Sequence, residues 1–338
     1  MNEQTNEQTN EQTGNRETRR ARDRVTKRIE RRFRRAGLGD VVVYWCEDYV
    51  VPAIDFETTV KSWYVAESLR GKPVPGVRIE APVSATVDEV LAVHAPAYVD
   101  ALQSGDPLTL AASNGIGWVD TLLEAVLAST GGVRDAVLRA LRERVHAGSL
   151  SSGLHHARYE SGNGFCTING IAVGALAALA DGARRVLIVD FDAHCGGGTA
   201  SIVEGVPGIE QVDVSVVRFD SYRSREGARL EFADADDYLD VCREVLAGVR
   251  DPEGIDVVIY NAGMDPHERA GGVAGITTDV LAEREGLVFD WAEEHGLPVA
   301  FVLAGGYLVD TDWEELVGLH RLTSRKAAAV MQARAAAA

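Results

Sequence analysis

The sequence predicts one α/β domain, with a central and mostly parallel sheet flanked by helices, that follows a disordered N-terminal arm. Short apolar runs, typical of buried strands, recur at 41–45, 186–189, 212–217, 257–260 and 299–303. Stretches with a helical composition separate them, for example 167–179, 238–249 and 278–294. Strands that alternate with helices favour a parallel sheet covered on both faces. Because no linker rich in Pro, Gly or Ser interrupts residues 38–338, we treat them as one domain.

Residues 1–37 have a different composition. The motif Asn-Glu-Gln-Thr occurs three times between Asn2 and Thr13, and such a polar repeat predicts disorder. Residues 16–35 then contain 11 Lys or Arg, and their few apolar residues are spaced as in a helix. We favour a loose, solvated helix that lies on the acidic body over an arm that binds nucleic acid or an acidic partner.

Charge and composition exclude several classes of protein. The net charge of the 338 residues is −17, and residues 36–338 carry 23 basic and 45 acidic side chains, a formal charge of −22. Such a body repels nucleic acid and attracts cationic substrates. No apolar run is long enough for a membrane span and no signal peptide is present, so we expect a cytoplasmic protein. The four cysteines form no CxxC pair, which disfavours thiolate zinc sites and disulfides.

Polar residues follow the predicted strands where an open α/β sheet usually holds its site. Asp190, Asp192 and His194 follow the strand at 186–189, and Asp265 follows the strand at 257–260. Asp192 and His194 are two residues apart, so an extended chain points both to the same side. Together with Asp265 they offer one nitrogen and two oxygen ligands. Three protein ligands and an open position are typical of catalytic zinc, although iron or manganese also suits this set.

Three further features point to hydrolysis at that metal. His155 and His156 are adjacent in a glycine-flanked loop, and imidazole serves as a base or an acid near neutral pH. Phe165 follows Gly164 in a glycine-rich turn, where its ring is free to line a pocket. Tyr307 follows two glycines after the strand at 299–303, so its hydroxyl is a candidate hydrogen-bond donor to an amide oxyanion.

These motifs, taken in order, resemble the histone deacetylase and acetylpolyamine amidohydrolase family. The first of four motifs combines Gly153-Leu154-His155-His156-Ala157 with Gly164-Phe165-Cys166 and Asn169. The other three are Val189-Asp190-Phe191-Asp192-Ala193-His194, Ala262-Gly263-Met264-Asp265 and Ala304-Gly305-Gly306-Tyr307. Val93-His94-Ala95-Pro96-Ala97-Tyr98 is similar to an early signature of the family. The resemblance runs from about His94 to His320, and four ordered motifs are far more specific than any one of them.

The resemblance implies an arginase-like fold and a role for each matching residue. Asp192, His194 and Asp265 would bind Zn²⁺, and His155 and His156 would act as the acid and base pair. Tyr307 would polarise the acetyl carbonyl, and Asp190 would orient His155. Gly164 and Phe165 would line a narrow tunnel for the acylated side chain of an acetylated amine substrate. A monovalent cation such as K⁺ would bind near Asp190 and Ser215.

The sequence also departs from the family pattern. The family usually has a second histidine, a glycine and then Asp or Asn after the metal histidine, but here Cys195, Gly196 and Gly197 follow His194. The group that would steady His156 is therefore missing at Gly197. The loops at 266–272 and 218–223 differ as well, and Asp106 has the wrong spacing for the rim acid that anchors peptide substrates. Histones are therefore a poor first choice of substrate, and a cationic or small acetylated amine is preferred.

Other classes of protein compete with this interpretation. A metallophosphoesterase also begins with Asp-x-His, but it requires Gly-Asp and Gly-Asn-His motifs that the sequence lacks. An arginase-like ureohydrolase requires more aspartates for two metals. A catalytically weak protein of the same fold that binds a metal or a ligand is the remaining alternative. The presence of His155, His156 and Tyr307 disfavours it, because metal binding alone requires none of them.

Overall fold

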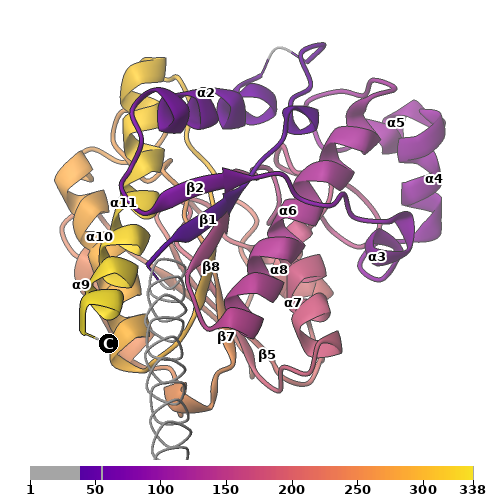
Figure 1. Cartoon of the computed structure of the whole chain (residues 1–338). Coiled ribbons are helices and arrows are strands. Elements are labelled where there is room, and N and C mark those ends of the chain that lie inside the picture. Colours follow the sequence, from indigo (N-terminus) through magenta and orange to yellow (C-terminus); the bar gives the residue numbers. More distant parts are fainter. Residues whose placement is uncertain (1–38, 55, 338) are drawn as a thin grey trace, which may run out of the picture.

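Eight strands form one parallel sheet in the computed structural model, which describes residues 39–54 and 56–337 (Figure 1). The order across the sheet is β2-β1-β3-β8-β7-β4-β5-β6. The strands are β1 Val41–Tyr44, β2 Val77–Glu80, β3 Ala147–Ser149, β4 Val186–Asp190, β5 Ile209–Ser215, β6 Ala228–Phe232, β7 Val257–Asn261 and β8 Val299–Val302. The predicted α/β fold is confirmed, and every pairing between these strands is parallel.

Helices cover both faces of the sheet (Figure 1). The longer ones are α2 Glu57–Gly71, α6 Leu122–Glu143, α7 Gly170–Ala180, α9 Tyr238–Ala247, α10 Thr278–Glu294 and α11 Trp313–Ala337. Shorter ones are η1 Glu47–Tyr49, α3 Val87–Leu91, α4 Pro96–Ser104, α5 Leu108–Ala111, α8 Gly197–Ile202 and η2 Pro252–Gly254. Helices α2, α9, α10 and α11 pack on one face, and α6 and α7 pack on the other. The three helices expected at 167–179, 238–249 and 278–294 are α7, α9 and α10.

The sequences of β1, β4, β7 and β8 are largely continuous apolar runs because both faces of these strands are buried. In β4, Leu187 and Val189 join the core beneath α9 and α10, whereas Val186 and Ile188 join the core beneath α6 and α7. Side chains alternate between the two faces of a strand, so a strand between two helical layers must be apolar at every position. Burial of one such side chain contributes roughly 1.5–3 kcal/mol to stability.

Strands β2, β3 and β6 are not among the predicted strands. Strand β3 consists of Ala147, Gly148 and Ser149, and it pairs with both β1 and β8. A Cβ on Gly148 would overlap the ring of Phe301, which covers this strand from β8. The sequence gives no apolar signal here because the large side chain that fills the space belongs to the neighbouring strand.

The strand order determines which loops meet. Strands β3, β8, β7, β4 and β5 are consecutive neighbours and all run in the same direction. The loops that follow residues 149, 302, 261, 190 and 215 therefore emerge side by side at one edge of the sheet, as expected for a site in an open α/β fold. Every candidate site residue named from the sequence lies at this edge or in these loops.

The N-terminal arm and the cellular location stay predictions. The N-terminal arm at 1–37 lies outside the described residues. Within the described ranges, no helix combines the length and apolar character that a membrane crossing requires. The cytoplasmic location stays a prediction.

Candidate active site

Asp192, His194 and Asp265 converge at the carboxyl edge of β4 and β7, as the sequence predicts. Their candidate ligand atoms all lie within 4.8 Å of one another. His194 Nδ1 lies 3.2 Å from Asp192 Oδ1 and 3.0 Å from Asp265 Oδ2. Both aspartates are buried, and His194 is partly exposed. Two carboxylates and one imidazole nitrogen thus face a common point that solvent reaches from the histidine side.

Backbone amides fix the two carboxylates. The amide of Gly305 donates to Asp192 Oδ2 at 2.9 Å, and the amide of Ala193 donates to Asp265 Oδ1 at 3.0 Å. Gly305 must be glycine, because a Cβ there would overlap the carboxylate of Asp265. The loops after β4, β7 and β8 therefore hold one another, and each carboxylate keeps one oxygen for the common point.

The electrostatics of this group favour a bound cation. Burial and the charge of Asp192 raise the pKa of Asp265. Burial opposes ionisation of Asp192 too, but the imidazoles of His155 and His194 hold the pKa of that carboxyl well below its usual range. Burial disfavours the charged form of His194, yet the two carboxylates raise its pKa to about 11. Positive charge is strongly stabilised at this point, and a metal ion supplies it as well as a proton does.

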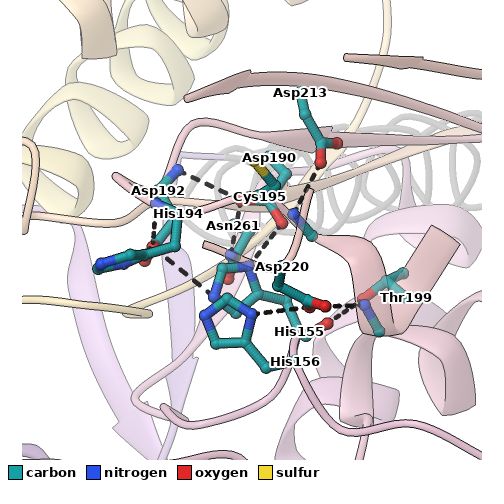
Figure 2. A network of polar contacts seen from close by, with 12 residues as sticks. His155, His156, Asp190, Asp192, His194, Cys195, Thr199, Asp213, Asp220 and Asn261 are labelled. Atoms are coloured by element: carbon teal, nitrogen blue, oxygen red, sulfur yellow. Dashed lines mark hydrogen bonds and ion pairs between the residues drawn. The ribbon is translucent and has the colours of Figure 1, made fainter. Parts of the chain in front are cut away.

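His155 and His156 lie beside this group, and each donates its Nδ1 hydrogen to a different carboxylate (Figure 2). His155 Nδ1 lies 2.9 Å from Asp190 Oδ2, and His156 Nδ1 lies 3.0 Å from Asp220 Oδ2. The two ring centroids are 3.8 Å apart. The Nε2 atom of His155 is 3.6 Å from Asp192 Oδ1, so this imidazole faces the metal-ligand group.

The two imidazoles titrate in opposite directions. Burial disfavours the charged form of His155, but the carboxylates of Asp190 and Asp192 outweigh that effect and raise its pKa to about 9. Burial and the neighbouring His155 lower the pKa of His156 to about 4, although Asp220 raises it in part. At pH 7 the pair therefore contains one charged and one neutral ring, which is the condition an acid and base pair needs.

Residues of the early signature and of the glycine-rich segment hold the histidine loop. His94 accepts a hydrogen bond from the amide of Asn169 at Nε2, 3.0 Å away, and its Nδ1 lies 2.8 Å from the carbonyl oxygen of Arg158. The side-chain amide of Asn169 donates to the carbonyl of Ala157 at 3.0 Å. Its oxygen accepts from the backbone amide of Ala172, so Asn169 is the N-cap of α7. These residues are structural supports behind His155 and His156.

Asp190 connects β4, β7 and the histidine loop. Besides His155, its carboxylate accepts from the side-chain amide of Asn261 at 2.9 Å and from the amide of Asp192 at 3.2 Å. The position predicted to orient His155 is thus in contact with it. Ser215, the other residue assigned to a monovalent cation, ends β5, and its buried Oγ has no hydrogen-bond partner among the residues that the structure describes.

Tyr307 lies in the loop that follows β8, next to the loop that carries Asp265. Its amide donates to the carbonyl of Ala270 at 3.0 Å, and Gly306, with φ +129°, lets the chain turn there. Burial and the carboxylates of Asp265 and Asp192 raise the pKa of Tyr307 well above its usual value. The hydroxyl therefore stays protonated at neutral pH and is available as a hydrogen-bond donor.

A cavity of about 420 Å³ leads to these residues. Its lining includes His156, His194 and Tyr307 at the inner end and the rings of Phe165 and Phe219. Phe165 is 38% exposed and Phe219 is 44% exposed, so two phenyl groups form open walls near the histidines. Gly164 and Phe165 thus lie where the sequence places them, whereas Asp106 is not among the lining residues.

Sequence reasoning missed four residues of the site. Lys61 of α2 is fully buried, and its Nζ donates to the carbonyls of Ala304 and Gly306 in the loop that carries Tyr307. Arg284 of α10 donates to the carbonyls of Phe191 and Gly263, at 2.9 and 2.6 Å, behind the two ligand loops. Arg284 stands between Glu283 and Glu285, so its sequence context gives no sign of its burial. Phe219 and Asp220 carry no signal, since their loop does not follow the expected pattern.

Known proteins resemble this chain over most of its length. The family model described as a histone deacetylase domain matches residues 56–319. An uncharacterized protein of Picosynechococcus is 35% identical over 244 residues, which cover 70% of this chain and 80% of that protein. A probable deacetylase of Methanothermobacter thermautotrophicus is 28% identical, with 68% of this chain and 74% of the relative covered. Histone deacetylase 2 of Arabidopsis thaliana is 29% identical, with 67% and 62% covered.

A solved structure, that of the HDA15 HD domain, supports the fold. It superposes with a TM-score of 0.70 at 20% identity and covers 86% of this chain and 90% of its own. At that identity the likeness concerns the fold, and the family assignment depends on the sequence matches. Because the family model spans most of the chain and includes every strand-end motif, the chain belongs to the histone deacetylase family.

Proposed function

We propose that this deacetylase is a zinc-dependent amidohydrolase that removes an acetyl group from an amine. The observation that carries the proposal is one arrangement: Asp192, His194 and Asp265 converge beside two carboxylate-bound histidines, and His194, His156 and Tyr307 line one cavity. A protein that only binds a metal has no need for the histidine pair or for the tyrosine. The substrate class is an acetylated polyamine, acetyl-lysine or an acetylated metabolite.

The donor set fits zinc. One imidazole nitrogen and two carboxylates leave an open coordination position, which is the arrangement of a catalytic rather than a structural zinc. Two buried carboxylates next to each other are costly unless positive charge compensates them. Bound at this point, zinc would supply a water of lowered pKa and polarise the acetyl carbonyl. Iron and manganese accept the same ligands, so metal analysis of the purified protein distinguishes them.

The histidine pair provides the proton transfers. Hydrolysis adds water across the amide: the C–N bond breaks, hydroxyl goes to the acetyl carbon and a proton goes to the leaving amine. His156 is neutral at pH 7, since burial and His155 lower its pKa to about 4, and it accepts the proton from water. His155, whose charged form the carboxylates of Asp190 and Asp192 favour, is the acid of the pair and gives its Nε2 proton to the leaving amine.

Tyr307 and the phenyl walls position the acetyl group. A protonated phenol beside the ligand group donates a hydrogen bond to the carbonyl oxygen, and such a donor is worth most when charge develops on that oxygen. Phe165 and Phe219 enclose an unbranched aliphatic chain without offering it polar contacts. The formal charge of −22 on residues 36–338 favours a substrate that carries a second, cationic amine.

The test is acetate release by the zinc-loaded full-length protein. A panel of acetylputrescine, acetylspermidine, free acetyl-lysine and an acetyl-lysine peptide covers the proposed class. We expect turnover of at least one member, and faster turnover of the small cationic amines than of the peptide. Full zinc occupancy without turnover of any member would favour the alternative, a metal- or ligand-binding protein of the same fold.

A monovalent cation near Asp190 and Ser215 is a second, smaller proposal. The buried Ser215 Oγ without a hydrogen-bond partner supports it, since a buried hydroxyl normally has one. Activity measured in KCl and in tetramethylammonium chloride at equal ionic strength tests it. Equal rates in both salts would contradict the proposal.

A further inference from the structure

Asp220 is a buried carboxylate within an otherwise accessible loop. It lies in the connection between β5 and β6, and its side chain is 1% exposed, whereas the neighbouring Phe219 is 44% exposed. Its backbone has φ +57°, in the left-handed region that, apart from glycine, asparagine and aspartate adopt most readily. The chain thus turns this carboxylate inward from a conformation that suits an aspartate.

Each oxygen of Asp220 has a donor. Oδ2 accepts from His156 Nδ1 at 3.0 Å and from the amide of Gly198 at 2.9 Å (Figure 2). Oδ1 pairs with the guanidinium of Arg158, which lies two residues after the histidine and remains 42% exposed. A buried carboxylate is stable only when hydrogen bonds and charge compensate its lost hydration. Asp220 meets that condition through His156, the start of α8 and Arg158.

Asp220 occupies the space that a side chain at position 197 would need. A Cβ on Gly197 would overlap the backbone carbonyl of Asp220 and would lie 2.8 Å from its carboxylate. Position 197, which differs from the family pattern described above, therefore has no room for a side chain here. The carboxylate that steadies His156 comes instead from a different loop, so the departure at Gly197 and the aspartate at 220 are one feature.

We propose that Asp220 is the positioning residue of His156, and that it replaces the group absent at Gly197. It holds the imidazole with the hydrogen on Nδ1, so that Nε2 is the free, proton-accepting nitrogen. Because Phe219 lines the cavity and Asp220 is the next residue, one loop both contacts the substrate and positions the base. This inference rests on the proposed amide hydrolysis.

Kinetics of the full-length zinc-loaded protein form the first test. We expect Asp220→Ala to lower kcat about 10- to 100-fold, with KM and zinc content close to those of the parent. Asp220→Asn keeps an oxygen that accepts from Nδ1 but places an amide group against Arg158, so its loss should be smaller. The exposed Asp236→Asn is the matched control and should be silent. A kcat within twofold of the parent for Asp220→Ala would overturn the proposal.

A double-mutant cycle with Gly197 is the second test. Gly197→Ala should push the Asp220 loop away and lower kcat, while Gly318→Ala, where a Cβ meets no atom within 4 Å, controls for glycine replacement in a helix. If both residues act through the same contact, the pair Gly197→Ala and Asp220→Ala is no worse than its more damaging member. Multiplicative losses would show independent effects and contradict the proposal.

Histidine nitrogen NMR separates this inference from the proposed reaction. In the ¹⁵N-histidine-labelled zinc form, the resonance lost in His156→Gln should report a protonated Nδ1 and an unprotonated Nε2. We expect Asp220→Ala to abolish that tautomer preference and Asp236→Asn to preserve it. An unchanged tautomer in Asp220→Ala would refute the positioning role, whatever the activity. Failure of the wild type to hydrolyse any substrate would refute the reaction and leave this readout intact.

Discussion

The loops after β4, β7 and β8 and the loop after β5 face the same cavity but differ in what constrains them. In the first three, Asp192 and Asp265 lie two and four residues past the ends of β4 and β7, and backbone amides of neighbouring loops hold their carboxylates. In the loop after β5, Asp220 lies five residues past Ser215 and reaches His156 from a left-handed backbone conformation, with the side chain of Arg158 on its other oxygen. The metal-ligand carboxylates are thus held by the backbone of adjoining loops, whereas the carboxylate behind His156 also depends on a side chain from another loop.

The largest effect is expected from the removal of Asp265, a candidate metal ligand in the loop after β7. Asp265→Ala should abolish both stoichiometric zinc and activity, since only two protein ligands would remain. Atomic absorption and acetate release measure the two effects, with the exposed Asp236→Ala as control. Zinc retained at full occupancy would mean that the third ligand is a different residue.

Removal of the Tyr307 hydroxyl should affect chemistry without affecting the metal. We expect Tyr307→Phe to lower kcat about 100- to 1000-fold, because one preorganised donor to the oxyanion is lost. Zinc content and the thermal midpoint should stay near those of the parent. A modest loss in kcat with a raised KM would instead assign the tyrosine to substrate binding.

The buried His94, which supports the histidine loop, predicts that the stability of the protein depends on pH. Burial lowers the pKa of His94 from 6.5 to about 4 in the folded protein. Between these pH values the unfolded chain binds more protons, so the free energy of unfolding falls as pH drops from 6.5 to 4. His94 should contribute roughly 3 kcal/mol to that fall.

Urea unfolding at pH 7 and pH 5 measures the effect of His94. His94→Gln retains one donor and one acceptor but does not titrate, so its unfolding free energy should depend less on pH. An identical pH dependence in the parent and the variant would mean that other groups cause the acid sensitivity. His146 provides a second test of the same effect. It is buried where β3 meets β8, and its pKa is lowered to about 3.

The smallest expected effect distinguishes two neighbouring residues in the loop after β5, Phe219 and Asp220. Phe219→Ala removes one wall of the cavity and should raise KM severalfold with less than a tenfold change in kcat, the reverse of the pattern expected for Asp220→Ala. Steady-state kinetics on the best substrate of the panel checks this. A large loss in kcat would show that the ring packed on His156, with centroids 4.9 Å apart, also helps to orient it.

Some residues of the site can be identified from the sequence and others cannot. Asp192, His194, Asp265 and Tyr307 were identifiable because each belongs to a motif within five residues of the end of an apolar run, and the ends of parallel strands meet at one edge. Lys61 and Arg284 were missed although they are buried, because their carbonyl partners belong to loops far away in the chain.

The sequence by itself determined the α/β architecture and the chemical types at the strand ends, because the period of buried strands and the identity of their following residues are local properties. Only the tertiary structure decided that Ala147–Ser149 is a central strand beneath Phe301, and that Asp220 takes the place left open at Gly197. Both outcomes depend on which atoms fill a given space. That is settled by packing between segments that are distant in sequence, so no local pattern records it.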